Sequence, residues 1–156
     1  MSMMSRVSTA STANATMTKF GYPDSVVAEY THWVVQLRPR QVTLGALVLI
    51  CKADARAFHA IGAAAFHELE RVTTDIEATL AELVAYERIN YLMLMMVDPD
   101  VHFHVIPRYS GTRLLEAIEL ADPGWPGPPD LKGGMDADAS LRNALVTALR
   151  EAWPSA

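Results

Sequence analysis

The sequence predicts an α+β fold in which an antiparallel sheet carries helix on one side. Four apolar segments rich in β-branched or aromatic residues predict the strands, and one long segment with apolar residues every three or four positions predicts the main helix. The strand segments are residues 30–37, 42–51, 89–97 and 100–109, and the helix is residues 63–86. Because the helix falls between two pairs of strands, the chain order favours hairpins over alternating strands and helices.

The composition limits the kind of protein. The chain has 156 residues, of which 51% are hydrophobic and 20% charged, and this fits one globular domain with a substantial core. A net charge of −5 argues against nucleic-acid binding but permits a locally positive pocket for a small anion. The single cysteine, Cys51, excludes an intrachain disulfide framework. No segment resembles a membrane span or a secretory signal, so we expect a cytoplasmic protein that does not bind membranes.

The chain begins with a segment of low complexity. Residues 1–19 are rich in Ser, Thr, Ala and Met, and this predicts a disordered N-terminal tail ahead of a folded domain over residues 20–156. In that domain the first two strands flank Arg38-Pro39-Arg40, a short polar link that predicts a hairpin. Gly62 marks the expected start of the long helix. The apolar stripe of this helix comprises Phe66, Leu69, Val72, Ile76, Leu80 and Leu83.

The second half of the chain is predicted to hold another hairpin. Asp98-Pro99 separates the last two strand segments, because proline lacks an N–H group and restricts the residue before it. From Ser110 onward the sequence indicates irregular structure, and residues 122–134 hold four of the nine prolines. A terminal amphipathic helix follows, with Leu141, Leu145, Leu149 and Trp153 spaced four residues apart.

Residues 100–109 (DVHFHVIPRY) carry the candidate functional residues. Successive side chains of a strand point to opposite faces, so Asp100, His102 and His104 share one face and the apolar residues between them face the core. An imidazole can attack an electrophile, bind a metal or shuttle a proton. The spacing therefore leaves open an active site, a metal site completed by Asp100 or a distant residue, and a structural polar face.

The same region resembles the signature of the histidine triad (HIT) superfamily, whose members hydrolyse or transfer nucleoside monophosphates. The family motif has three alternating histidines, and Asp100, His102 and His104 stand at these positions. Asn90 matches the family's asparagine, twelve residues before the central histidine. Residues 43–49 (TLGALVL) are similar to a glycine-containing strand of the family, and residues 122–126 (DPGWP) to a D-x-x-WP element of a bacterial branch that also replaces the first histidine.

This resemblance implies a HIT-like fold, which is an antiparallel sheet with one long helix and a C-terminal helix. It implies that His102 attacks the α-phosphate of a nucleotide to form a nucleotidyl-histidine, and that His104 binds phosphate oxygens. Asn90, Asp100 and Arg108 are the expected substrate-binding residues. The implied protein is a HIT hydrolase or nucleotidyl transferase that cleaves a phosphoanhydride or a phosphoramidate, and it uses no metal or cofactor.

The resemblance also implies a two-fold homodimer with the long helix and a sheet edge at its interface. The many alanines of residues 63–86 agree with this, because small side chains allow close approach of a second helix. Residues 89–97 are apolar on both faces, which agrees as well.

Several positions depart from the family pattern: Met96 and Val97 replace the polar residues that some branches place before the motif, Lys52-Ala53-Asp54 stands where a further histidine often follows the second strand, and Asp100 and Arg38 differ as well. Asp100 places a carboxylate where the motif has its first histidine, and this charge either opposes an anionic substrate or holds His102 or His104 protonated. Arg38 stands where many members hold the ribose with an acidic or amide side chain. These departures favour an alternative function, namely a HIT-like protein that binds a nucleotide in a regulatory role without chemistry.

Overall fold

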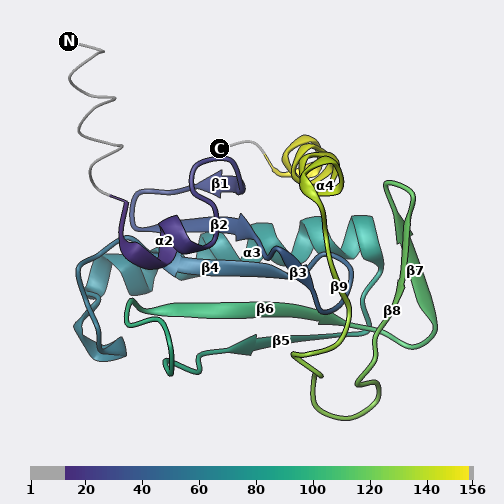
Figure 1. Ribbon diagram of the computed structural model, residues 1–156. Coiled ribbons are helices and arrows are strands. Elements are labelled where there is room, and N and C mark those ends of the chain that lie inside the picture. Colours follow the sequence, from purple (N-terminus) through teal and green to yellow (C-terminus); the bar gives the residue numbers. More distant parts are fainter. Residues whose placement is uncertain (1–12, 155–156) are drawn as a thin grey trace.

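The computed structural model describes residues 13–154 and has a five-stranded sheet at its centre (Figure 1). The strand order is β1-β2-β4-β6-β5, and each neighbouring pair is antiparallel. The strands are β1 (Val26–Glu29), β2 (Trp33–Leu37), β4 (Leu47–Cys51), β5 (Arg88–Leu92) and β6 (His102–Arg108). The predicted α+β fold and both predicted hairpin pairings, β2 with β4 and β5 with β6, are confirmed.

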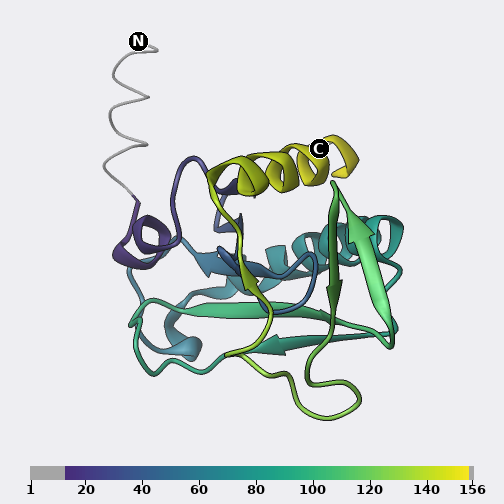
Figure 2. The same cartoon turned by 45° about the vertical axis from the view of Figure 1, so that its right-hand side comes forward.

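Helix α3 (Ala63–Val84) covers one face of this sheet, as predicted from its apolar stripe. Val72, Ile76 and Leu80 have no exposed surface and belong to the main core, together with alternate residues of β2, β4 and β6. Gly62 is the N-cap, and its φ of +94° is a conformation that glycine adopts without strain. Helix α4 (Ala139–Ala152) lies at the β1 edge of the sheet and packs against β1 and α3 (Figures 1 and 2).

Two expected strands are much shorter than their apolar runs, and the strand expected over residues 30–37 begins only at Trp33. The predicted strand over residues 42–51 begins only at Leu47, because Gly45 turns the chain with a φ of +92°. The predicted strand over residues 89–97 ends at Leu92, and Met95 with a φ of 52° turns the chain away from the sheet. The apolar composition located both strands correctly. Turns in the backbone determine where the first of them begins and where the second ends.

The expectation of irregular structure after Ser110 is wrong for residues 112–121. Strands β7 (Thr112–Leu115) and β8 (Ile118–Ala121) form a hairpin that stands beside the main sheet (Figure 2). Residues 122–134 are irregular as predicted. The remaining short elements are the helical turn η1 (Phe58–Ala60) and the two-residue strands β3 (Arg40–Gln41) and β9 (Met135–Asp136), which pair with each other.

The folded part begins earlier than Phe20, which corrects the expected boundary of the N-terminal tail. Helix α2 (Ala15–Lys19) is capped by the Asn14 side chain, which accepts a hydrogen bond from the Met17 backbone N–H at 2.9 Å. Met17 is buried with Val34, Val48 and Ile50 on the sheet face opposite α3. Residues 1–12 of the predicted tail lie outside the described residues. Between residues 13 and 154, no helix has the length and hydropathy needed to cross a membrane.

Candidate active site

Strand β6 carries both motif histidines on the face of the sheet that lies opposite α3. His102 is paired with Ile50 and His104 with Val48 of the neighbouring strand β4, and both partners pack under α2. Val101 and Val105 point to the other face and join the main core, as the alternation predicted. The two imidazole centroids are 5.2 Å apart, with an angle of 82° between the ring planes.

The proton of His102 is fixed by a backbone group. Its Nδ1 lies 2.6 Å from the carbonyl oxygen of Asp100, which can only accept a hydrogen bond. Nδ1 of the neutral ring therefore carries the proton, and Nε2 holds the lone pair. Within the described part of the chain, this Nε2 has no hydrogen-bond partner. His102 consequently offers a free nucleophilic nitrogen.

His104 is held in the opposite tautomer. The Nε–H group of Arg38 donates to Nδ1 of His104 at 3.2 Å, so Nδ1 is unprotonated and Nε2 carries the proton. Burial, then repulsion from Arg38 and His102, lower the pKa of His104 to about 4. The ring is neutral at pH 7 and presents an N–H donor. A lone pair on His102 thus stands beside a donor on His104, which suits attack on an electrophile whose oxygen gains negative charge.

Asp100 has a different partner from the one expected. Its Oδ2 accepts hydrogen bonds from the backbone N–H and the hydroxyl of Thr16 in α2, at 3.2 and 2.9 Å. The carboxylate thereby anchors α2 and is itself buried, with 4% of its surface exposed. The idea that Asp100 keeps His104 protonated is wrong, because the pKa of His104 is lowered and Asp100 is not among the groups that shift it.

The end of α2 also lies against His104. The Phe20 ring meets His104 edge-on, with centroids 6.1 Å apart, and Gln36 on β2 donates to the Met17 carbonyl at 3.1 Å. His102 and His104 are only 2% and 8% exposed. The two imidazoles therefore offer only a small exposed surface to a ligand.

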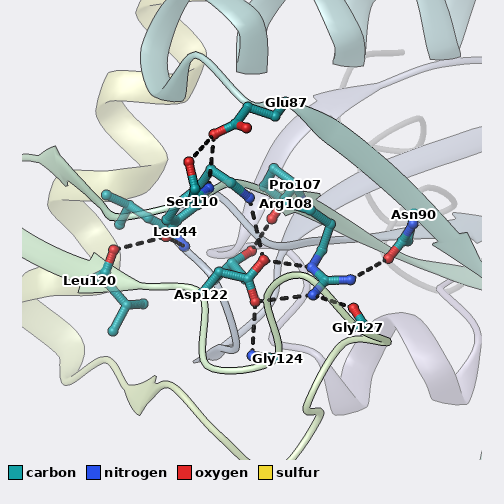
Figure 3. Close-up of polar contacts among 12 residues, drawn as sticks. Leu44, Glu87, Asn90, Pro107, Arg108, Ser110, Leu120, Asp122, Gly124 and Gly127 are labelled. Carbon is teal, nitrogen blue, oxygen red and sulfur yellow. Dashed lines mark hydrogen bonds and ion pairs between the residues drawn. The ribbon is translucent and has the colours of Figure 1, made fainter.

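Arg108 and Asn90 lie further along the same sheet face and bind to each other. Figure 3 shows the Arg108 guanidinium directed at Asp122, Asn90 and Gly127. Its Nε is 2.7 Å from Asp122 Oδ2, and both side chains are almost fully buried. Asn90 is paired with Ile106, two positions beyond His104 on β6. In this structure Arg108 fastens the proline-rich loop to the sheet, and Asn90 accepts a hydrogen bond from Arg108.

Three residues of this region were not singled out as functional by sequence reasoning. Thr16 lay in the expected tail, Asp122 was noted only within the D-x-x-WP element, and Arg38 was noted only as a departure. A charged residue flanking a proline between two strands was the available signal for Arg38. Among residues 13–154 there is no group of three or more His, Cys, Asp or Glu side chains that could hold a metal ion.

This architecture is that of histidine triad (HIT) proteins. The structure resembles a HIT protein from Sinorhizobium meliloti, with a TM-score of 0.69 and 20% sequence identity over 89% of this chain and 94% of that chain. It also resembles a histidine triad protein from Bradyrhizobium japonicum, with a TM-score of 0.65 and 16% identity over 91% and 97%. A third similar structure is a hypothetical histidine triad nucleotide-binding protein from Sulfolobus tokodaii, with a TM-score of 0.63 and 17% identity over 82% of each chain.

Comparison of the sequence, unlike comparison of the structure, finds no relative. A scan against models of protein families gives no match, and a search of curated proteins gives none either. The solved structures therefore confirm the predicted HIT-like fold and the resemblance on which it was based.

Proposed function

We propose that this protein is a HIT-type nucleotide hydrolase or nucleotidyl transferase that acts at the α-phosphate. The observation that carries this proposal is the pair of opposite tautomers, with a lone pair on His102 Nε2 and an N–H donor on the adjacent His104. The fold supports it, since one structurally similar protein is described as a histidine triad nucleotide-binding protein. The substrate is a small nucleotide with a phosphoanhydride or phosphoramidate bond.

The chemistry has two steps. Nε2 of His102 attacks the α-phosphorus and forms a P–N bond, while the bond from phosphorus to the leaving group breaks and the leaving group departs with that electron pair. The Asp100 carbonyl accepts a hydrogen bond from Nδ1–H and stabilises the ring as it becomes positive. His104 donates to a phosphate oxygen. Water, or an acceptor alcohol in the transferase reaction, then attacks phosphorus, the P–N bond breaks, and the nucleophile loses its proton to the medium.

A trapping experiment tests this function. The protein is mixed with diadenosine polyphosphate or adenosine phosphoramidate labelled at the α-phosphate, and is then denatured in alkali. We expect label on the wild-type protein that survives alkali and is released by acid, as a phosphorus–nitrogen bond should be. His102→Ala should carry no label and should lose turnover by several orders of magnitude.

His67→Ala is the matched control, because His67 is an exposed histidine on α3 and takes no part in the proposed chemistry. It should be labelled like the wild type. Turnover by a folded His102→Ala variant at the wild-type rate would refute the mechanism.

A second function has one observation in its favour. Both imidazoles are nearly buried, and Asp100 holds α2 beside them. This arrangement agrees with a protein that binds a nucleotide for regulation without cleaving it. The two functions give different results: the regulatory protein binds a mononucleotide in calorimetry, but it neither turns over the labelled substrates nor retains label.

We also propose that the protein is a homodimer. Strand β5 lies at the edge of the sheet, so its outer backbone groups have no strand partner among the described residues. On the outer side of α3, Ala78, Ala81 and Ala85 are exposed, and Met96 and Val97 after β5 are 85% and 81% exposed. A second copy packed on β5 and α3 would cover this surface through a self-complementary contact.

A further inference from the structure

A cavity of about 640 Å³ adjoins the edge strand β5. Arg88, Asn90 and Leu92 line it, and because they alternate along the strand they share one face of the sheet. Leu92 is paired with His104 on β6, and residues paired across an antiparallel ladder point to the same face. The cavity therefore lies on the face that carries the motif histidines, one strand away from His104.

Nε2 of His104 lies on the β5 side of its ring. Nδ1 accepts a hydrogen bond from Arg38, which follows β2, and the two nitrogens of an imidazole point in nearly opposite directions. The strand order is β1-β2-β4-β6-β5, so the direction away from Arg38 is the direction of β5. A substrate whose reacting phosphate is bound by this Nε2 can therefore continue across Leu92 into the cavity.

Three side chains of the cavity have hydrogen-bond donors to spare. Asn90 Oδ1 accepts from Arg108 Nη1 at 2.9 Å, and because a guanidinium only donates, the amide nitrogen of Asn90 is on the side away from Arg108, as Figure 3 shows. In the described part of the chain, neither this nitrogen nor Trp125 Nε1 has a hydrogen-bond partner. Arg88 donates to the Glu87 carbonyl at 2.9 Å and, within the same residues, forms no ion pair. The cavity therefore offers donors from three directions of the chain to a ligand that accepts.

Positive charge prevails in this cavity. None of the described residues that line it is acidic, and the charge of Arg108 is balanced by Asp122, so the charge of Arg88 remains. The carboxylate of Glu87 accepts hydrogen bonds from Ser110. Apolar side chains supply much of the remaining lining: Ile89, Leu92, Pro126, Pro128 and Pro129. Together with the indole of Trp125, this lining suits an anion that also carries a flat ring.

We infer that this cavity binds the leaving group of the proposed reaction, with Arg88 and Asn90 donating to its acceptor atoms and Trp125 stacking on its ring. The inference rests on the proposed function and deepens it. Two parts of the substrate flank the reacting phosphate: the nucleoside is neutral, whereas the leaving group of a phosphoanhydride is an anion. The charge of the cavity selects the leaving group, and the flat ring selects a nucleotide. The substrate is therefore a dinucleoside polyphosphate.

Two substrates with the same reacting half test the inference. His102 attacks an adenosine-bearing phosphate in both, but diadenosine triphosphate releases ADP and adenosine phosphoramidate releases ammonia. Trp125→Ala and Arg88→Gln should each lower kcat/KM for diadenosine triphosphate about tenfold, as expected for one lost stacking or charge-assisted contact. Turnover of the phosphoramidate should persist at the wild-type level, because ammonia does not reach the cavity walls.

Arg56→Gln is the matched control, since Arg56 is exposed and lies outside the cavity. It should leave both substrates unchanged. An equal loss for both substrates in Trp125→Ala and Arg88→Gln would mean that these residues support the fold only, and it would overturn the inference. Unchanged turnover of diadenosine triphosphate in both variants would overturn it as well.

Calorimetry with ADP alone separates this inference from the proposed function. ADP is the expected leaving group, so wild-type protein should bind it about tenfold more tightly than Trp125→Ala or Arg88→Gln does. This loss of affinity without trapped nucleotidyl-His102 would remove the chemistry and keep the cavity as a nucleotide site. Trapped nucleotidyl-His102 with equal ADP affinity in all three proteins would keep the chemistry and reject the cavity.

Discussion

A single buried imidazole gives this protein a distinct response to acid. His104 is 8% exposed, and its pKa is lowered to about 4 by burial, Arg38 and His102, with Asp98 opposing the shift. In the unfolded chain the same ring takes up a proton near pH 6.5. Between these two values the unfolded state binds more protons than the folded state, so stability must fall as the pH falls.

We predict that wild-type protein loses on the order of 2–3 kcal/mol of unfolding free energy through His104 between pH 7 and pH 4.5. Other groups also titrate in this range, so the measurement is the difference between wild type and His104→Gln in urea unfolding at several pH values. The curves should converge as the pH is lowered. Parallel curves would mean that His104 is protonated normally in the folded state.

Asp100 shows how the role of one residue depends on its partner. Taken alone, a carboxylate at a motif position suggests an effect on the substrate or on the histidine charges. In the structure its carboxylate accepts a hydrogen bond from the Thr16 hydroxyl, and its backbone carbonyl accepts one from His102 Nδ1. The backbone contribution to the site is independent of the side chain, which explains how an acidic residue can stand there and leave the tautomer of His102 in place.

At the scale of elements, helix α2 is the short piece that packs on the sheet face carrying the histidines. It has only five residues, which is too short to be stable alone, and it depends on its Asn14 cap, on Met17 in the sheet face and on the Thr16–Asp100 contact. A short helix held by a few side-chain contacts opens at a lower free-energy cost than the core strands.

We predict that Thr16→Val loosens α2, because it leaves the buried Asp100 carboxylate with one hydrogen bond fewer, at a cost of about 1–3 kcal/mol. His102 and His104 should then react faster with diethyl pyrocarbonate, as followed by peptide mass spectrometry. Thr18→Val is the matched control, since Thr18 lies in the same helix but is exposed. If both variants leave the histidines as protected as in the wild type, α2 does not control their accessibility.

The Arg108–Asp122 ion pair anchors the proline-rich loop to the sheet, just as the Asp100 carboxylate anchors α2. Arg108 also donates to the Gly127 carbonyl, and Asp122 accepts from the Gly124 backbone N–H, so the first half of the loop is tied to β6 (Figure 3). These contacts hold the loop although it has no core of its own. Removing one partner of such a buried pair would be costly, because it leaves an uncompensated charge.

At the scale of the whole molecule, the proposed homodimer has a direct test. Light scattering at micromolar concentration should give twice the 17.1 kDa of one chain. Ala81→Arg should shift the protein towards the monomer, because a long charged side chain at an exposed small residue of α3 blocks close approach. Thr147→Arg, on the exposed side of α4, should leave the mass unchanged. A wild-type mass near one chain would reject the dimer.

The order of the main elements could be read from the sequence because hydrophobic periodicity reflects local backbone geometry. The long helix, the terminal helix and the four central strands all carry that signal. Strands β1, β7 and β8 have four residues each, so too few residues repeat for a pattern to emerge. Helix α2 was hidden for a different reason: its residues resemble a disordered segment, and tertiary contacts stabilise it.

The sequence by itself determined that His102 and His104 share one face of a strand, since alternation of side chains is a property of the extended backbone. Only the tertiary structure decided what meets them. Arg38 lies 66 positions from His104, and Thr16 lies 84 positions from Asp100. Such contacts follow from how the sheet and α2 are assembled, and no local pattern records them. The tautomers and the burial of the site are therefore products of the assembled fold.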